Sequence, residues 1–300
     1  MSGTLVVNEI YLSLQGESTF AGLPCIFVRL TACNLRCSYC DTAYAFTEGK
    51  KRELSEILAE IRQQAEPFKY RGSTIENSTS PAPSPRPSPQ GRGTEFDHVS
   101  TIADDSIIRE AGVVPPSSGG EGGLKASPGI SRLPLIELTG GEPLLQPNAL
   151  NLMKVLCDEG FTVLLETSGA HDISKVDSRV RRIMDLKCPS SGEVARNLWE
   201  NLTHLKSTDE IKFVIGTVED YEWAARQISE HQLATICPLL MSWVQPLAPE
   251  QQDKSLKRVP AGQTPISRRE LAERIVADAL PVRFQAQLHK IIWPAEQRGV

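Results

Sequence analysis

The 300-residue sequence contains no apolar run near the roughly 20 residues that a membrane-spanning helix requires, so we expect no transmembrane segment. The first residues, 1–5, lack the basic start and the apolar stretch of a secretory signal. Acidic and basic residues are interspersed with a formal net charge of −5, whereas nucleic-acid binding needs a concentrated basic face. We therefore predict a cytoplasmic globular protein that contacts neither a membrane nor nucleic acid directly.

Apolar runs alternate with helical patterns along the chain, and this alternation predicts an α/β fold with a parallel sheet and crossover helices. Strands are expected at 5–14, 24–30, 135–138, 162–165, 183–186, 211–215 and 235–240. Helices are expected at 54–65, 149–158, 221–230 and 267–279. About six core strands are too few for an eightfold barrel, so we predict an abbreviated, open partial (β/α) barrel.

The composition changes after Tyr70, where residues 71–132 include the Pro/Ser-rich stretches 80–89 and 115–120. Such a segment cannot bury enough apolar surface to offset an ordering entropy of ~1–2 kcal/mol per residue. We predict one domain over residues 1–300, interrupted in a single loop by a disordered, low-complexity insertion at 71–132. A binding role for this insertion is the alternative interpretation.

Three of the seven cysteines, Cys33, Cys37 and Cys40, form a C-x3-C-x2-C loop after a predicted strand. In a cytosolic protein, cysteines this close together indicate metal ligands more than disulfides. A structural zinc site takes four ligands, and no fourth cysteine lies near, although His171 remains available. A [4Fe–4S] cluster with three thiolates keeps one iron open, as a catalytic metal requires. The other four cysteines, Cys25, Cys157, Cys188 and Cys237, suit buried core positions.

Polar residues follow several of the predicted strands at their carboxyl ends, where ligands gather in parallel sheets. These segments are 139–142 (Thr-Gly-Gly-Glu), 167–169 (Thr-Ser-Gly) and 185–187 (Asp-Leu-Lys). Strand-end carbonyls and the Glu142 carboxylate can accept hydrogen bonds from an ammonium group, and Gly141 allows a ligand to approach the backbone. The candidate chemistry therefore converges on one face of the sheet.

Together these motifs resemble the radical S-adenosylmethionine (SAM) superfamily. Tyr39 precedes the third cysteine as in the superfamily signature, and the 139–143 segment resembles its second motif. The resemblance implies a [4Fe–4S] cluster whose open iron chelates SAM. One electron, from a flavodoxin-like or other reductant, then cleaves SAM to a 5′-deoxyadenosyl radical that abstracts hydrogen from the substrate.

A narrower resemblance covers nearly the whole chain except residues 71–132. The segments 13–17 (Ser-Leu-Gln-Gly-Glu), 40–42, 166–169, 185–192 and 287–290, together with Arg29, resemble the 7-carboxy-7-deazaguanine synthase family. That family is a lyase family that converts 6-carboxy-5,6,7,8-tetrahydropterin into 7-carboxy-7-deazaguanine with loss of ammonia, on the route to queuosine. The long Pro/Ser-rich insertion departs from the family pattern.

The resemblance also implies roles for individual residues. The pterin substrate would contact Leu14, Gln15, Gly16, Glu17, Arg29 and Thr139. SAM would contact Tyr39, Cys40, Asp41, Gly141, Glu142, Ser168, Asp185, Leu186, Lys187, Gln245 and Pro246. Thr42 would supply one oxygen to a Mg²⁺ ion, a hard cation that prefers oxygen ligands. Arg29 suits a substrate carboxylate because its planar fork binds both oxygens.

Simpler interpretations remain for several of these residues. Segment 15–17 could be a polar turn, Arg29 a surface ion pair, Thr42 a cap and Lys187 a solvated side chain. No residue is assigned as catalytic, and His289 and Lys290 either enter the site or border it. A glycyl-radical activating enzyme is one alternative function, and a zinc-stabilised interaction protein is another. Open sheet edges favour a homodimer.

Overall fold

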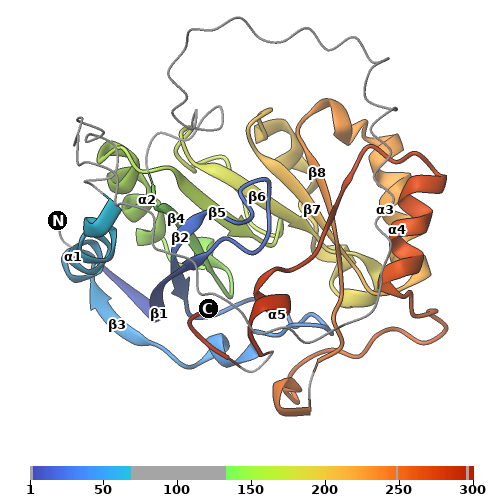
Figure 1. Cartoon of the computed structure of the whole chain (residues 1–300), viewed down its shortest axis with the longest axis horizontal. Coiled ribbons are helices and arrows are strands. Elements are labelled where there is room, and N and C mark those ends of the chain that lie inside the picture. The colour runs from blue at the N-terminus through green and yellow to red at the C-terminus, as the bar shows by residue number, and fades with distance from the viewer. Residues whose placement is uncertain (1–2, 69–132, 248, 295–296) are drawn as a thin grey trace, which may run out of the picture. The chain divides into compact units, whose positions relative to one another are not determined.

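A computed structural model describes residues 3–68, 133–247, 249–294 and 297–300 of the chain. The chain divides into two compact units, one formed by Met1–Gly72 and Ile130–Val300 and the other by Ser73–Gly129. The second unit and the predicted disordered insertion lie outside the described residues (Figure 1). All that follows concerns the first unit.

The described residues form one nine-stranded, mostly parallel sheet in the order β3-β1-β2-β4-β5-β6-β7-β8-β9. The strands are β1 (Thr4–Leu14), β2 (Pro24–Leu30), β3 (Lys50–Glu53), β4 (Leu135–Gly140), β5 (Val163–Thr167), β6 (Arg181–Leu186), β7 (Glu210–Ile215), β8 (Leu239–Trp243) and β9 (Arg283–Gln285). β1 pairs antiparallel with β2 and β3, and every other pairing is parallel. Because β3 and β9 are not paired with each other, the sheet stays open, which confirms the predicted α/β class.

Four of the described helices cover one face of this sheet. They are α1 (Leu54–Ala65), α2 (Asn148–Asp158), α3 (Val218–Glu230) and α4 (Arg268–Ala277). The short α5 (His289–Ile292) instead borders the cavity described below. Figure 1 shows α1 and α2 beside the strands of the first half and α3 and α4 beside β7 and β8. α1 forms because Leu54, Ile57, Leu58 and Ile61 recur at helical spacing and are all buried. Among the described helices, none combines the length and the apolar character needed to cross a membrane.

The predicted element boundaries hold for most of the core and shift near the C-terminal half. The expected strand at 235–240 is instead a 3-10 turn at Leu233–Thr235, followed by β8 from Leu239. Pro238 has no N–H to give to a ladder, and its carbonyl accepts from Ile211, so the strand starts after it. The short strands β3 and β9 were not predicted, because four charged residues and the three-residue Arg-Phe-Gln carry no alternating pattern.

The strands present their polar side chains at one end of the uncovered face. Along β4, Leu135, Glu137 and Thr139 lie on this face, so it changes from apolar to polar toward the end of the strand. The same change runs from Leu164 to Glu166 on β5 and from Ile183 to Asp185 on β6. The apolar positions form a small core with Cys25 and Phe27. Because the polar positions of β4, β5 and β6 lie toward the carboxyl ends of these strands, those ends border a polar chamber.

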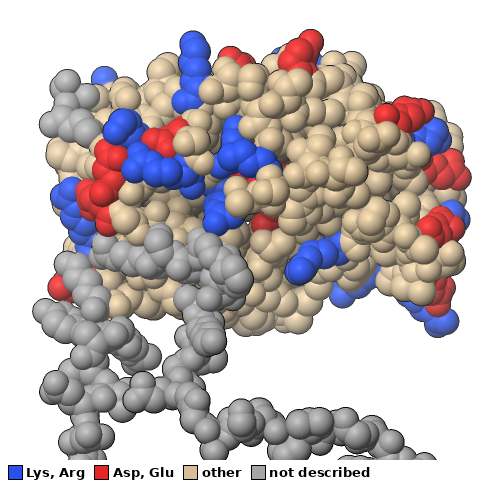
Figure 2. All heavy atoms as spheres, turned by 90° about the horizontal axis from the view of Figure 1, so that it is seen from above, with Lys and Arg blue, Asp and Glu red and all other residues tan. Residues whose placement is uncertain are grey.

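On the surface seen in Figure 2, acidic and basic side chains are intermixed.

Candidate active site

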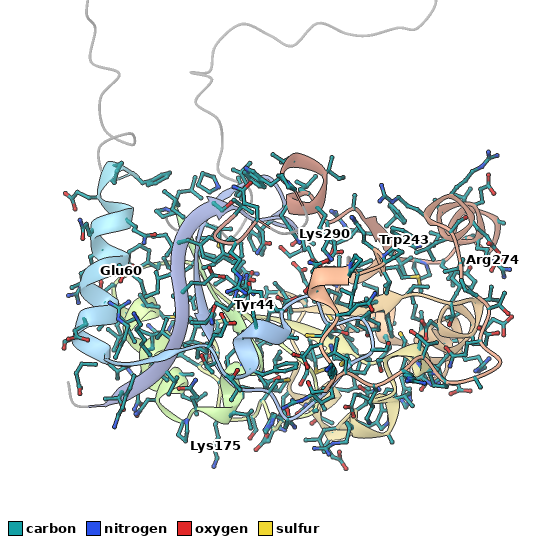
Figure 3. All side chains as sticks on the ribbon, turned by 90° about the horizontal axis from the view of Figure 1, so that it is seen from below. Tyr44, Glu60, Lys175, Trp243, Arg274 and Lys290 are labelled. Carbon is teal, nitrogen blue, oxygen red and sulfur yellow. The ribbon has the colours of Figure 1, made fainter. Side chains whose placement is uncertain are left out.

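A cavity of about 600 Å³ lies at the carboxyl ends of the strands, and most of the predicted site residues line it. The lining includes Leu14, Gln15, Gly16, Glu17, Arg29, Cys33, Cys37, Tyr39, Cys40, Asp41, Thr42, Thr139, Gly141, Ser168, Asp185, Lys187 and Gln245. Glu142, Leu186 and Pro246 are not among the lining residues. In Figure 3, Tyr44 and Lys290 lie near the centre of the fold, whereas Glu60, Lys175 and Arg274 lie at its rim.

The cysteine loop is held in place by the turn that follows β6. The backbone N–H of Ser38 donates to the Ser191 carbonyl over 3.1 Å, and its hydroxyl donates to the Ser190 carbonyl over 2.7 Å. Glu193 accepts from the backbone N–H of Arg36 over 2.7 Å and pairs with Lys257 over 2.8 Å. These contacts hold the 33–40 loop against residues 190–193, which are about 150 positions away in the sequence.

The three cysteine side chains share the cavity as free thiols. Burial raises the pKa of Cys37 to about 11 and that of Cys40 to about 12, so these thiols need a bound cation to become thiolates. Among the described residues, no three Cys, His, Asp or Glu side chains are arranged to hold a single metal ion. Three soft donors on one loop still fit an iron–sulfur cluster better than a hard cation.

The Gly-Gly-Glu segment fits closely against this loop. A Cβ at Gly141 would overlap the carbonyl oxygen of Ala32, the residue before Cys33, so only glycine allows this approach. The Glu142 carboxylate is fully buried and accepts from the Ser168 N–H over 2.8 Å and the Ser168 hydroxyl over 2.6 Å. It also accepts from the Thr167 hydroxyl over 3.0 Å. Its contact with SAM stays a prediction, and in the structure it joins β4 to the end of β5.

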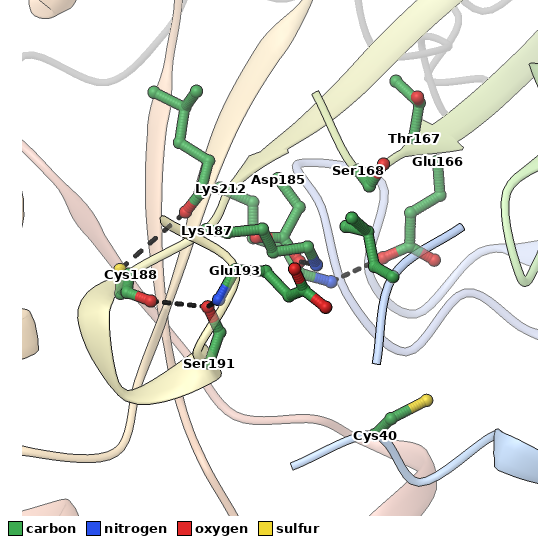
Figure 4. Close-up of polar contacts among 12 residues, drawn as sticks. Cys40, Glu166, Thr167, Ser168, Asp185, Lys187, Cys188, Ser191, Glu193 and Lys212 are labelled. Carbon is green, nitrogen blue, oxygen red and sulfur yellow. Dashed lines mark hydrogen bonds and ion pairs between the residues drawn. The ribbon is translucent and has the colours of Figure 1, made fainter. Parts of the chain in front are cut away.

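An ion pair lies at the end of β6, beside the cysteines. Lys187 Nζ is 2.6 Å from Asp185 Oδ2 (Figure 4), and the second Asp185 oxygen is buried without a hydrogen-bond partner among the residues that the structure describes. An acceptor without a donor indicates room for a ligand that brings one. Leu186 between them faces the helices in the main core. Asp185 and Lys187 thus border the space predicted for SAM.

Arg29 lies on β2, which β4 and β5 separate from Asp185 on β6 in the sheet. Its Nε is 2.7 Å from Glu9 Oε1, and its Nη2 donates to the Tyr11 hydroxyl over 2.7 Å. Its guanidinium also lies near the rings of Tyr11 and Tyr44, at 5.8 and 6.0 Å from their centroids. The side chain is therefore oriented, and it is not a freely solvated surface arginine.

The C-terminal segment closes over the 14–17 turn. The Leu288 N–H donates to the Gly16 carbonyl over 3.0 Å, and Lys290 pairs with Asp41 over 2.6 Å. A Cβ at Gly16 would lie 2.6 Å from His289 Nδ1, so glycine is required for this approach. His289 and Lys290 both line the cavity. Thr42 donates to Asp41 over 3.1 Å, and its contact with Mg²⁺ stays a prediction.

Sequence reasoning assigned no role to four polar residues that line the cavity: Tyr11, Glu137, Glu166 and Lys212. It also missed Glu9, which pairs with Arg29. Lys212 offered a signal, because a lone lysine within the apolar run Ile211–Ile215 is rarely buried without a partner. Glu166 is the first residue of the 166–169 segment, which carried the family resemblance without a role for this side chain. The partners of these residues come from distant segments and left no local pattern.

The chain is 34% identical over 98% of its length to a 7-carboxy-7-deazaguanine synthase from Koribacter versatilis, 99% of which is covered. The chain belongs to the 7-carboxy-7-deazaguanine synthase family. A 7-carboxy-7-deazaguanine synthase from Chlorobaculum tepidum is 32% identical over 99% of this chain and 97% of its own. No family model matches the chain.

A solved structure supports the fold. The crystal structure of QueE from Escherichia coli aligns with a TM-score of 0.53 and 19% identity, covering 94% of each chain. The open, mostly parallel sheet is therefore an architecture that the 7-carboxy-7-deazaguanine synthase family chain shares with QueE. The predicted family and the predicted fold class are both confirmed.

We expect Glu193→Ala to weaken cluster retention, because Glu193 is buried and holds the backbone between Cys33 and Cys37. Removing it leaves the Arg36 backbone N–H without this acceptor, at a cost of roughly 1–3 kcal/mol, while Lys257 keeps the Gly192 carbonyl and loses its carboxylate partner. Iron and sulfide per chain after anaerobic reconstitution and desalting should fall at least twofold. Glu200→Ala, at an exposed position, is the matched control. Equal iron in both variants would contradict the anchoring role.

Proposed function

We propose that the chain is a 7-carboxy-7-deazaguanine synthase of the radical SAM type. It would convert 6-carboxy-5,6,7,8-tetrahydropterin into 7-carboxy-7-deazaguanine with loss of ammonia, as a carbon–nitrogen lyase on the route to queuosine. The observation that carries the proposal is similarity over the full chain to curated synthases at up to 34% identity. The cavity supports it, because the motif cysteines and Arg29 line the same chamber.

The family implies a [4Fe–4S] cluster and SAM as cofactors, and the donor set of this chain suits them. Cys33, Cys37 and Cys40 would hold the cluster. When bound, the cluster and SAM supply the one-electron chemistry that abstracts a hydrogen from the substrate. Gly141 leaves room beside the cysteine loop, and the unpartnered Asp185 oxygen offers an acceptor. Tyr39, Asp41, Ser168, Lys187 and Gln245 would border SAM.

The part of the cavity lined by Arg29 and the 14–17 turn would bind the pterin. Arg29 would direct its guanidinium to the substrate carboxylate, an arrangement that charge-assisted hydrogen bonds favour. Gln15 and Glu17, with the backbone of Gly16 and Leu14, would match the donors and acceptors of the pterin edge. Thr139 would be a further contact. We also propose Thr42 as an oxygen ligand of Mg²⁺, an ion that takes most of its other ligands from water and substrate.

Further parts of the proposal concern the setting of the enzyme. A flavodoxin-like or other reductant would deliver the electron, the assembly would be a homodimer, and the location would be the cytoplasm. A glycyl-radical activating enzyme would share the cysteines and the Gly-Gly-Glu segment. It would not need Arg29 and the 14–17 turn, which here line the same cavity.

Anaerobic incubation with SAM, dithionite and 6-carboxytetrahydropterin tests the proposal by mass analysis. We expect 7-carboxy-7-deazaguanine and 5′-deoxyadenosine as products. Iron-loaded protein that cleaves SAM but leaves the carboxypterin unchanged would contradict the assigned substrate. Colourless, zinc-loaded protein would contradict the enzyme class.

A further inference from the structure

One buried lysine in the cavity wall has no role in the function as proposed so far. Lys212 lies on β7 between Ile211 and Phe213, whose side chains pack in the helix-facing core. Because side chains alternate along a strand, Lys212 points to the opposite face, into the cavity. Only 4% of the residue is exposed. A lysine buried this deeply requires compensation for its charge.

Two carboxylates from other segments provide that compensation. Lys212 Nζ is 2.7 Å from Glu17 Oε2 and 2.5 Å from Glu166 Oε1. Figure 4 shows Lys212 and Glu166 together, with Asp185 and Lys187 beside them and Cys40 farther away. Glu17 comes from the turn after β1, and Glu166 comes from β5. The ammonium thus links the turn after β1, which is proposed to contact the substrate, to β5 in the middle of the sheet.

The remaining oxygens of these carboxylates are also oriented. Glu166 Oε2 accepts from the Thr139 hydroxyl over 2.9 Å, and Glu17 Oε1 accepts from Gln287 Nε2 over 2.8 Å. The Glu17 N–H donates to Gln15 Oε1 over 3.0 Å, and Gln15 Nε2 donates to Glu137. Three of the proposed substrate contacts are therefore linked to Lys212. Glu17 contacts it directly, Thr139 through the Glu166 carboxylate, and Gln15 through the backbone N–H of Glu17.

The charges of this cluster depend on Lys212. Burial on its own raises the pKa of Glu17, but the Lys212 ammonium, with His289, lowers it to about 2. Burial and the nearby Glu166 instead raise the pKa of Glu137 well above its usual value. Burial opposes the charge of Lys212, whereas Glu166, Glu17 and Asp185 raise its pKa well above the usual value. Lys212 therefore keeps Glu17 an acceptor at neutral pH.

We propose that Lys212 is a positioning residue for the substrate, whose ammonium holds Glu17 and Glu166 side by side as acceptors for the N–H edge of the pterin ring. This role rests on the proposed function, because the ligand it explains is the pterin. An ionised carboxylate has only acceptor oxygens, whereas the amino group and ring N–H of a pterin are donors. Without the ammonium, two adjacent buried carboxylates would repel each other, and one would take up a proton.

The role predicts a particular pH dependence. The charged or titratable groups around Lys212 and Glu17 are Glu137 on β4, Glu166 on β5, Asp185 on β6, Lys187 after it, Glu210 on β7, and His289 on α5. Asp41 and Lys290 lie next to His289 in turn. In Lys212→Met, burial acts on Glu17 without the opposing ammonium, so the pKa of Glu17 rises. Glu17 is then protonated at low pH and ionised at high pH. The defect in substrate use should therefore be largest at low pH and shrink as pH rises.

The experiment compares wild-type protein with Lys212→Met, Lys212→Arg and the exposed control Lys154→Met, all cluster-loaded. Measurements are iron content, SAM binding by equilibrium dialysis, and kcat and KM for 6-carboxytetrahydropterin from about pH 6 to 9. We expect Lys212→Met to raise KM roughly tenfold or more at the low end, with iron and SAM binding unchanged. Lys212→Arg should restore a flat pH profile with an intermediate KM.

Several outcomes would overturn this role. One is a wild-type KM in Lys212→Met at every pH, and another is a pH-dependent loss in Lys212→Arg equal to that in Lys212→Met. Loss of iron and SAM binding in both Lys212 variants would mark Lys212 as a folding residue instead. Wild-type protein that forms no product marks a failure of the proposed function, and the positioning role then fails with it.

Discussion

Replacing Cys33, Cys37 or Cys40 by alanine is expected to abolish the iron–sulfur cluster and to reduce turnover below detection. All three thiols line one cavity, and their loop is anchored through Ser38 to the turn after β6. Each of the three thiolates would hold one iron of the cluster, so loss of one would leave two irons without a protein ligand. If SAM binds at the open iron, as the family implies, its binding should be lost with the cluster.

The measurement is iron and sulfide per chain, with the visible absorbance of the cluster, after anaerobic reconstitution of each variant. Cys157→Ala is the matched control, because Cys157 is buried at the end of α2 away from the cavity. It should load as wild type does. Full cluster content in any of the three loop variants would contradict the assignment of that cysteine as a ligand, even if turnover is lost.

Arg29→Ala is expected to lower kcat/KM for the carboxypterin roughly 10- to 150-fold, while cluster content and SAM binding stay unchanged. A partly desolvated Arg–carboxylate pair contributes roughly 1.5–3 kcal/mol through charge-assisted hydrogen bonds. Arg29 is already oriented by Glu9 and Tyr11, so little side-chain entropy is lost when it meets the substrate. Arg29→Lys keeps the charge without the fork and should give an intermediate value.

Glu9 requires its own control, because Arg29→Ala also leaves this carboxylate without its cation. In Glu9→Gln the arginine keeps its charge and its hydrogen bond to Tyr11, and only the negative charge beside it is removed. If substrate binding depends on Arg29 itself, Glu9→Gln should cost much less than Arg29→Ala in steady-state turnover. Equal losses in the two variants, or an equal loss of SAM binding in Arg29→Ala, would show that the pair is structural and that Arg29 does not clamp substrate.

The sequence alone was sufficient for features that depend on short spacing along the chain. The C-x3-C-x2-C loop, the glycines before Glu142 and the helical spacing of α1 are all readable within a dozen residues. Such spacings are fixed by the covalent chain, so they can be recognised in the sequence without knowledge of the tertiary contacts. The α/β class followed for the same reason, because each strand and helix carries its own apolar period.

The tertiary structure alone decided which groups face each other. Lys212 meets Glu17 and Glu166, which are 195 and 46 residues away, and Glu193 meets Arg36 across 157 residues. The structure also showed which groups of the chain the Glu142 carboxylate contacts, namely Thr167 and Ser168, and its predicted contact with SAM stays a prediction. A buried charge needs a partner, but any segment of the fold can provide it. Only the packing of the strands determines which one does, and no local period in the chain records that choice.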